Sequence, residues 1–156
     1  MTVEARIFVD TNVLVYAYDA DAGKKHEIAR DLVARLWRSR EGTLSTQVLQ
    51  EFYVTVTRKL LTPLDPTTAR RVVATYQGWP LMTIDVTCIL DAIEISERNQ
   101  LSFWEGLIVA AARQAGAERV MTEDLQSGRP IEGLVIESPF GTEFTRGNQK
   151  LDFGHF

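Results

Sequence analysis

Four acidic side chains occupy positions from which a folded chain could gather them around a metal ion. Asp10 and Asp124 each come directly or shortly after a short apolar run, and Glu51 and Glu105 lie on segments with helical apolar spacing. Carboxylates brought together repel one another, and some would then stay protonated. Mg²⁺ or Mn²⁺ removes that repulsion, because hard cations take carboxylate oxygens as ligands. If the fold brings these acids together, the chemistry they suit is metal-assisted phosphodiester hydrolysis.

Each acid also has a purely structural interpretation. Asp10 and Asp124 suit turns or helix N-caps, and Glu51 suits the solvated face of a helix. Glu105 completes a Ser-x-x-Glu sequence with Ser102 ahead of an apolar helix, which is typical of a capping box. The spacing of the acids alone therefore does not assign a metal site.

The elements that would position these acids alternate along the chain. Short apolar runs predict strands over residues 7–9, 43–45, 79–84, 119–122 and 134–137. Apolar spacing predicts helices over residues 13–18, 26–40, 47–61, 67–77, 86–99 and 103–114. We expect Thr11 or Asn12 to cap the first helix. This alternation predicts an α/β fold with a mostly parallel sheet flanked by helices on both faces. Ligands bind such sheets at the carboxyl ends of the strands, where Asp10 and Asp124 should meet.

Composition limits the function classes further. The chain has 156 residues, 45% of them hydrophobic, which suits one domain with its own core. A formal net charge of −4 argues against a protein that grips nucleic acid by bulk positive charge. No apolar run approaches the ~20 residues needed to cross a bilayer. The lone Cys88 lies in an apolar stretch and should be a small core residue, which suits a reducing cytoplasm, the expected location.

The end of the chain differs from the rest. We expect one folded domain over residues 1–138 and a C-terminal tail over residues 139–156. The tail has no strand or helix period, yet it contains several phenylalanines: Phe140, Phe144, Phe153 and Phe156. It is either disordered or an arm that packs on another surface, and the sequence leaves both alternatives open.

Four segments resemble, in order, the four acidic segments of PIN-domain ribonucleases of the VapC toxin type. They read FVDTNVLVYA over residues 8–17, STQVLQEF over residues 45–52, LSFWEGLI over residues 101–108 and MTEDLQSG over residues 121–128. The resemblance extends from residue 7 to about residue 140. The four segments together are specific, whereas the Asp-x-Asn of the first segment alone would not be.

This resemblance implies a PIN-like three-layer fold and a metal-dependent endoribonuclease toxin that hydrolyses RNA phosphodiester bonds. It also implies Mg²⁺ or Mn²⁺ as cofactor, a cognate antitoxin protein that neutralises the toxin, and a homodimer. Carried over by position, the catalytic metal ligands would be Asp10, Glu51, Glu105 and Asp124. Asn12 and Thr122 would orient a ligand or a water molecule.

One segment departs from the family pattern, which has Asp followed by Ala where this chain has Glu105 and Gly106. Glutamate binds the same metals but is one methylene longer, and a misplaced group can cost about 10²-fold in rate. Gly106 should also cost helix stability, about 1 kcal/mol relative to Ala. The alternative function is therefore a PIN-fold regulator that binds RNA or protein and cleaves weakly or not at all. A metal-dependent phosphatase is a more distant reading, because the sequence has no glycine-rich phosphate loop.

Local basic and aromatic residues could contact RNA. Basic pairs occur at Lys24 with Lys25, Arg58 with Lys59, and Arg70 with Arg71, and the candidate phosphate contacts are among them, although solvated helix faces explain them adequately. The three tryptophans could stack on bases. For Trp104, which begins an apolar helix, we expect core packing instead.

Overall fold

The computed structural model describes residues 5–141 and contains a five-stranded, all-parallel sheet within that range. Its strands are β1 (Arg6–Val9), β2 (Gly42–Ser45), β3 (Leu81–Met82), β4 (Ala117–Met121) and β5 (Val135–Glu137). The order across the sheet is β3-β2-β1-β4-β5. The central positions of the sheet are apolar and buried, as in Phe8 and Leu44 at 0% exposure, because helices cover both faces.

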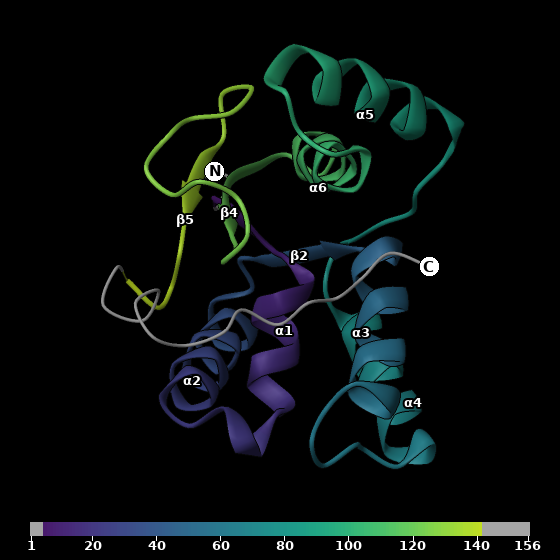
Figure 1. Cartoon of the computed structure of the whole chain (residues 1–156), viewed down its shortest axis with the longest axis vertical. Helices are drawn as coiled ribbons and strands as arrows, with labels where there is room; N and C mark the ends of the chain where they lie inside the picture. Colours follow the sequence, from purple (N-terminus) through teal and green to yellow (C-terminus); the bar gives the residue numbers. More distant parts are fainter. Residues whose placement is uncertain (1–4, 142–156) are drawn as a thin grey trace.

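Six α-helices flank this sheet in the described residues. They are α1 (Thr11–Tyr18), α2 (Lys24–Ser39), α3 (Thr46–Arg58), α4 (Pro66–Thr75), α5 (Val86–Asn99) and α6 (Phe103–Gln114). One 3₁₀ turn, Ala20–Ala22, precedes α2, and another, Tyr76–Gly78, follows α4. Figure 1 shows α5 and α6 on one side of the strands and α1 to α4 on the other. The predicted α/β architecture with a parallel, helix-flanked sheet is confirmed. Within residues 5–141, no helix has both the length and the apolar character that crossing a membrane requires.

The strand order places a switch point between β1 and β4. The chain runs from β1 outward through β2 to β3, then returns through α5 and α6 to β4 on the other side of β1. Val9 pairs with Met121, and the N–H of Asp10 donates to the carbonyl of Met121 at 3.0 Å. The chain segments that leave these two strands are therefore neighbours. In parallel sheets, this is the crevice in which ligands bind.

The element boundaries differ from the prediction in a few places. Asp10 caps α1, not Thr11 or Asn12, since its carboxylate accepts from the Thr11 N–H and the helix begins one residue later. The strand predicted over residues 79–84 is only Leu81–Met82, because Tyr76–Gly78 form a 3₁₀ turn and Trp79 is buried against the core. Helix α3 ends at Arg58, three residues earlier than predicted. Among the predicted site residues, Asn12 therefore lies inside α1, and Lys59 lies directly after α3.

Cys88 and Phe140 complete the core. Cys88 is free and fully buried on α5, as predicted, and burial raises the pKa of its thiol to about 11. Phe140 is 2% exposed, and its ring packs edge-on against Tyr16 with centroids 5.2 Å apart. The predicted tail therefore begins with a residue, Phe140, that packs on the domain core. The rest of the tail, residues 142–156, lies outside the described residues, and the boundary after residue 138 stays a prediction.

Candidate functional site

Asp10 is held in a fixed position between β1 and α1. As the N-cap of α1, its Oδ1 accepts from the Thr11 N–H at 2.7 Å, and its Oδ2 accepts from the Thr122 hydroxyl at 2.8 Å. Asp10 is 6% exposed and Thr122 is fully buried. Asp10 directly follows β1 and Thr122 directly follows β4, so this hydrogen bond joins the two strands that flank the switch point.

Asn12 connects the first and fourth acidic segments. Its amide Nδ2 donates to Asp124 Oδ2 at 2.9 Å and lies 3.5 Å from Asp10 Oδ2. Its Oδ1 accepts from the N–H of Glu123 at 3.1 Å. Asn12 is 1% exposed, so these interactions are shielded from bulk water. The role that the resemblance implies for Asn12, to orient a ligand or a water molecule, stays a prediction.

Glu51 reaches the same region from helix α3. Ser45, at the end of β2, caps α3 by accepting from the Val48 N–H, so α3 starts at the carboxyl edge of the sheet. One turn further on, Glu51 is 8% exposed, and its Oε1 accepts from the Thr11 hydroxyl at 2.9 Å. Thr11 thus joins the second acidic segment to the first.

Glu105 closes the pocket from α6 while it also caps that helix. Its Oε1 accepts from the Ser102 N–H at 3.1 Å, and Ser102 Oγ accepts from the Glu105 N–H at 3.1 Å. The capping box expected from the sequence is therefore formed. Glu105 is partly exposed and lines the pocket described next. The Glu105 side chain therefore both completes the capping box of α6 and lines the acidic pocket.

All four predicted acids line one small pocket of about 40 Å³ at the carboxyl edge of the sheet. The full lining is Asp10, Thr11, Gln47, Glu51, Trp104, Glu105, Ile108, Asp124 and Leu125. A water molecule takes up about 30 Å³ in the liquid. The pocket therefore has room for a small ion or a water molecule, and larger groups must lie at its mouth.

Burial and the neighbouring acids together favour the protonated form of Asp10. Burial raises its pKa from 3.8 to about 7, and the nearby charges of Asp124 and Glu51 add to that rise. The hydrogen bonds from Thr122 and Thr11 act in the opposite direction but are outweighed. An unpaired buried carboxylate of this kind is stabilised by a cation.

The donor set fits a hard divalent cation. Carboxylate, amide and hydroxyl oxygens are the ligands that Mg²⁺ and Mn²⁺ take. Among residues 5–141, no three Asp, Glu, His or Cys side chains already stand around one point in the way that could hold an ion. Mg²⁺ does not require this, because it usually keeps several waters and is bound through one or two carboxylates. Asp10 and Asp124, bridged by Asn12, are the pair best placed to supply them.

The prediction that Lys25 contacts RNA is wrong. Lys25 is 4% exposed, and its ammonium pairs with the carboxylate of Glu123 at 2.5 Å. The ammonium also lies 5.1 Å from the ring centroid of Tyr16, whose hydroxyl donates to the same Glu123 carboxylate at 2.8 Å. Lys25 is thus a core cation that supports the chain next to Asp124, and it is not open to a phosphate.

The other predicted basic contacts lie on the surface. Lys24, at the start of α2, and Arg58 and Lys59, at the end of α3, are exposed. None of them lines the acidic pocket. Their contact with RNA stays a prediction.

The prediction that Trp104 packs in the core is wrong. Its side chain is 38% exposed and lines the pocket. Gln47 and Thr11 also line the pocket, and sequence reasoning assigned neither of them to the site. A signal for Gln47 was present, since it precedes Glu51 by four residues and so shares its helix face. For Thr11 the signal was its place between Asp10 and Asn12.

Gly106 has a packing role that explains the second departure from the family pattern. A Cβ at position 106 would lie 2.7 Å from the carbonyl oxygen of Ala92 and 3.0 Å from the Cβ of Ser96. Both residues belong to α5, which packs closely on α6. The glycine therefore lets the two helices approach, and its role concerns α5 and not the longer acid beside it.

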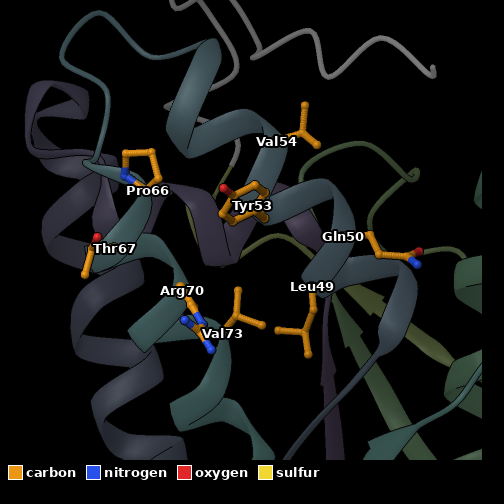
Figure 2. A pocket seen from close by; sticks show the side chains of 8 residues that line it. All are labelled: Leu49, Gln50, Tyr53, Val54, Pro66, Thr67, Arg70 and Val73. Atoms are coloured by element: carbon orange, nitrogen blue, oxygen red, sulfur yellow. The ribbon is translucent and has the colours of Figure 1, made fainter.

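A second and larger pocket, of about 670 Å³, opens between α3 and α4 (Figure 2). It is lined mostly by apolar surface from Leu49, Gln50, Tyr53, Val54, Pro66, Thr67, Arg70 and Val73. At 100° per residue, Leu49 and Tyr53 lie on nearly the opposite face of α3 from Glu51. This groove is therefore separate from the acidic pocket.

Comparisons with known proteins place the chain by sequence and by fold. A family model described as PIN domain matches residues 7–128, which include all four acids. No curated protein matches the sequence. Several solved structures share the fold, among them the following three. VapC20 of Mycobacterium tuberculosis, described as a toxin that cleaves the sarcin-ricin loop, is 21% identical over 76% of this chain and 89% of its own, with a TM-score of 0.57.

The other two solved structures are assemblies. A toxin-antitoxin complex from Klebsiella pneumoniae has a TM-score of 0.64 and 15% identity over 86% of this chain and 98% of the matched chain. DNA-bound VapBC from Salmonella typhimurium has a TM-score of 0.61 and 18% identity over 87% and 99%. At these identities the likeness extends to the fold alone.

Proposed function

The chain belongs to the PIN-domain family, and from that premise we propose that it is a Mg²⁺- or Mn²⁺-dependent endoribonuclease toxin. The observation that carries this proposal is the convergence of four acids from four separate segments on one pocket at the switch point of the sheet. The proposed metal ligands and catalytic residues are Asp10, Glu51, Glu105 and Asp124.

Each neighbouring residue has a distinct task in this proposal. Thr122 and Thr11 orient the carboxylates of Asp10 and Glu51 by donating hydrogen bonds to them. Asn12 keeps Asp124 beside Asp10, because its amide N–H groups face the carboxylates of both residues. When bound, the ion would supply a Lewis acid that lowers the pKa of a water molecule and neutralises charge on the phosphodiester. The side chains would act by preorganisation, since they are fixed before substrate arrives.

The partners in this proposal are RNA, an antitoxin protein and a second copy of the chain. The described structural neighbours support the first two, because one is described as an RNA-cleaving toxin and others as toxin-antitoxin complexes. With a net charge of −4, the chain has no bulk attraction for RNA, so the metal and local contacts must supply the affinity.

RNA cleavage by the purified chain, free of any partner, tests the proposal. With Mn²⁺ present, structured and single-stranded RNA should be cut by the wild type, and EDTA should stop the reaction. Asp10→Asn keeps the size and the acceptor oxygen of the N-cap but removes the charge, so it should lose cleavage by at least about 10²-fold. Equal activity in the two proteins would contradict the proposal.

A second function is favoured by one specific observation, which is the engagement of Glu105 in the capping box. If that carboxylate serves the helix only, the chain would bind RNA or a partner and cleave weakly. Glu105→Asp restores the family's acid. A large rise in cleavage in this variant would support the regulator, whereas a fall from clear wild-type cleavage would support the enzyme with glutamate as the working residue. Unchanged cleavage and metal affinity would mean that position 105 is not what limits the activity.

A further inference from the structure

Trp104 is the large apolar side chain at the mouth of the acidic pocket. It is the second residue of α6, next to Glu105, and it is 38% exposed. The other two tryptophans are packed differently. Trp79 is 4% exposed, and Trp37 lies against it with ring centroids 5.3 Å apart. The indole of Trp104 is therefore the tryptophan side chain that combines partial exposure with a place at the acidic pocket, within residues 5–141.

The Trp104 segment is held firmly in place. Phe103 packs edge-on against the indole ring, with centroids 5.1 Å apart and planes at 72°. The backbone carbonyl of Trp104 accepts from Gln47 Nε2 at 3.4 Å, which links the first turn of α6 to α3. The capping box between Ser102 and Glu105 fixes the same turn. These contacts hold the backbone of Trp104, and the Phe103 ring lies against its indole beside the pocket.

The dimensions of the pocket decide which part of a nucleotide can reach this ring. At about 40 Å³, the pocket admits an ion, a water molecule or a phosphate oxygen but not a nucleobase. When a phosphate faces the acids, its bases must lie outside, at the rim that Trp104 forms. Without a bound cation the acidic lining repels the RNA backbone, so an uncharged contact has particular value here.

We propose that Trp104 stacks on a nucleobase next to the phosphate held at the acidic pocket, and so binds single-stranded RNA without reading its sequence. This inference rests on the proposed ribonuclease function. Stacking on an aromatic side chain tolerates every base because each has a π-face. Gln47 is the positioning residue, because it holds the carbonyl of Trp104 and does not touch the base itself.

The test uses the full chain with Asp10→Asn to prevent cleavage, and short single-stranded RNA as the probe. RNA labelled at one end reports binding by anisotropy, while tryptophan emission reports stacking. RNA should quench emission in this background, and Trp104→Phe should abolish the quenching but keep most of the affinity, since the phenyl ring still stacks. Trp104→Leu should weaken binding about 5- to 150-fold, which corresponds to the 1–3 kcal/mol of one stacked base.

The matched control is Tyr53→Leu. Tyr53 is also 38% exposed and aromatic, but it lines the groove on the opposite face of α3 (Figure 2). Its loss should leave RNA affinity unchanged. In the cleavage-competent chain, Trp104→Leu should raise KM for RNA much more than it lowers kcat, which a merely structural role would not produce.

Two results would overturn the inference, and they differ from each other. If RNA binds and is cleaved but Trp104→Leu binds as tightly as Trp104→Phe, stacking is wrong and the ribonuclease stands. If no RNA binds or is cleaved by any version of the chain, the proposed function fails and the stacking proposal fails with it.

Discussion

The amide of Asn12 donates to the carboxylate of Asp124 at 2.9 Å, across 112 residues of sequence. The same nitrogen lies 3.4 Å from the hydroxyl oxygen of Thr122 and 3.5 Å from the carboxylate of Asp10. In a pocket lined by acids, this amide is the neutral donor between two negative groups. The hydrogen-bond donor of Asn12, and not only the size of its side chain, therefore sets how close the carboxylates of Asp10 and Asp124 can lie.

Asn12→Asp should destabilise the metal-free protein. Aspartate keeps the oxygen that accepts from the Glu123 N–H but replaces the donor by another carboxylate, so Asp124 loses a hydrogen bond and gains a repulsion. We expect a loss of about 1–3 kcal/mol in the free energy of unfolding in EDTA. Mg²⁺ or Mn²⁺ should restore part of it, because a cation removes the repulsion. Urea denaturation with and without metal measures both, and equal stability of the variant and wild type in EDTA would contradict the prediction.

Metal-free stability should depend on pH through Asp10. Its folded pKa of about 7 lies above the usual 3.8, so between these values the folded protein retains a proton that the unfolded chain has lost. This contribution to stability is complete below about pH 4 and decreases by about 1.4 kcal/mol per unit as pH rises towards 7. Asp10→Asn removes the dependence, so in EDTA the variant should gain on the wild type from pH 5 to pH 7 and no further at pH 8. A stability difference that does not change with pH would rule out the raised pKa.

The same proton should compete with the cation. Below pH 7 a metal must displace the proton of Asp10, so its apparent affinity should fall up to tenfold per pH unit. Titration calorimetry with Mn²⁺ at pH 6, 7 and 8 measures this. Affinity that is constant over the range would mean that Asp10 does not ligate the ion.

Glu105→Gln separates the two tasks of Glu105. Glutamine can still complete a capping box with Ser102, but it removes the negative charge from the pocket. If Glu105 is a metal ligand, the variant should keep its stability within about 0.5 kcal/mol and lose most of its metal-dependent cleavage. Glu105→Ala is the companion variant, because it also loses the hydrogen bond from the Ser102 N–H and should cost about 0.5–1.5 kcal/mol. Full activity in Glu105→Gln would assign this residue to the helix cap alone.

The buried pair of Lys25 and Glu123 should behave as one unit. Their side chains are 5% and 1% exposed, so removing either charge leaves the other buried without its partner. We expect Lys25→Met and Glu123→Gln each to cost about 3–5 kcal/mol, and the double variant to cost clearly less than the sum. A double-mutant cycle by urea denaturation gives the coupling. Additive losses would show that the pair is not coupled.

The parts of the site that sequence reasoning predicted share a local signal. A short apolar run followed by an acid, as at Asp10, indicates a strand and its carboxyl end within a few residues. Parallel topology then brings such ends together, which is why Asp10 and Asp124 share a pocket with Glu51 as expected. The capping box at Glu105 is equally local, and it too was predictable.

The parts that were missed depend on contacts between distant segments. Lys25 looked like a surface cation because its partner, Glu123, is 98 residues away and gives no signal beside it. Trp104 begins an apolar helix and so was expected to be buried. Its exposure follows from the position of that helix end beside the pocket, which the packing of α6 on α5 and on the sheet decides.

Gly106→Ala should destabilise the protein although alanine is the better helix former. Propensity alone predicts a gain of about 1 kcal/mol. Against it, the new Cβ would stand 2.7 Å from the carbonyl oxygen of Ala92, which belongs to a helix backbone and cannot rotate away. Helix α5 would have to move, at an overpacking cost of typically 1–3 kcal/mol, so the free energy of unfolding should fall. Thermal and urea denaturation measure this change.

The matched comparison for Gly106→Ala is the same variant in a Ser96→Gly background. Ser96→Gly removes the 3.0 Å contact with the Ser96 Cβ but leaves the Ala92 carbonyl in place. The cost of the new methyl group should therefore shrink only in part. A stabilised Gly106→Ala would mean that α5 and α6 do not pack this closely. If the cost is found, a return to the family's acid must be made by Glu105→Asp alone, because alanine at position 106 would disturb the helix pair and obscure the effect on the site.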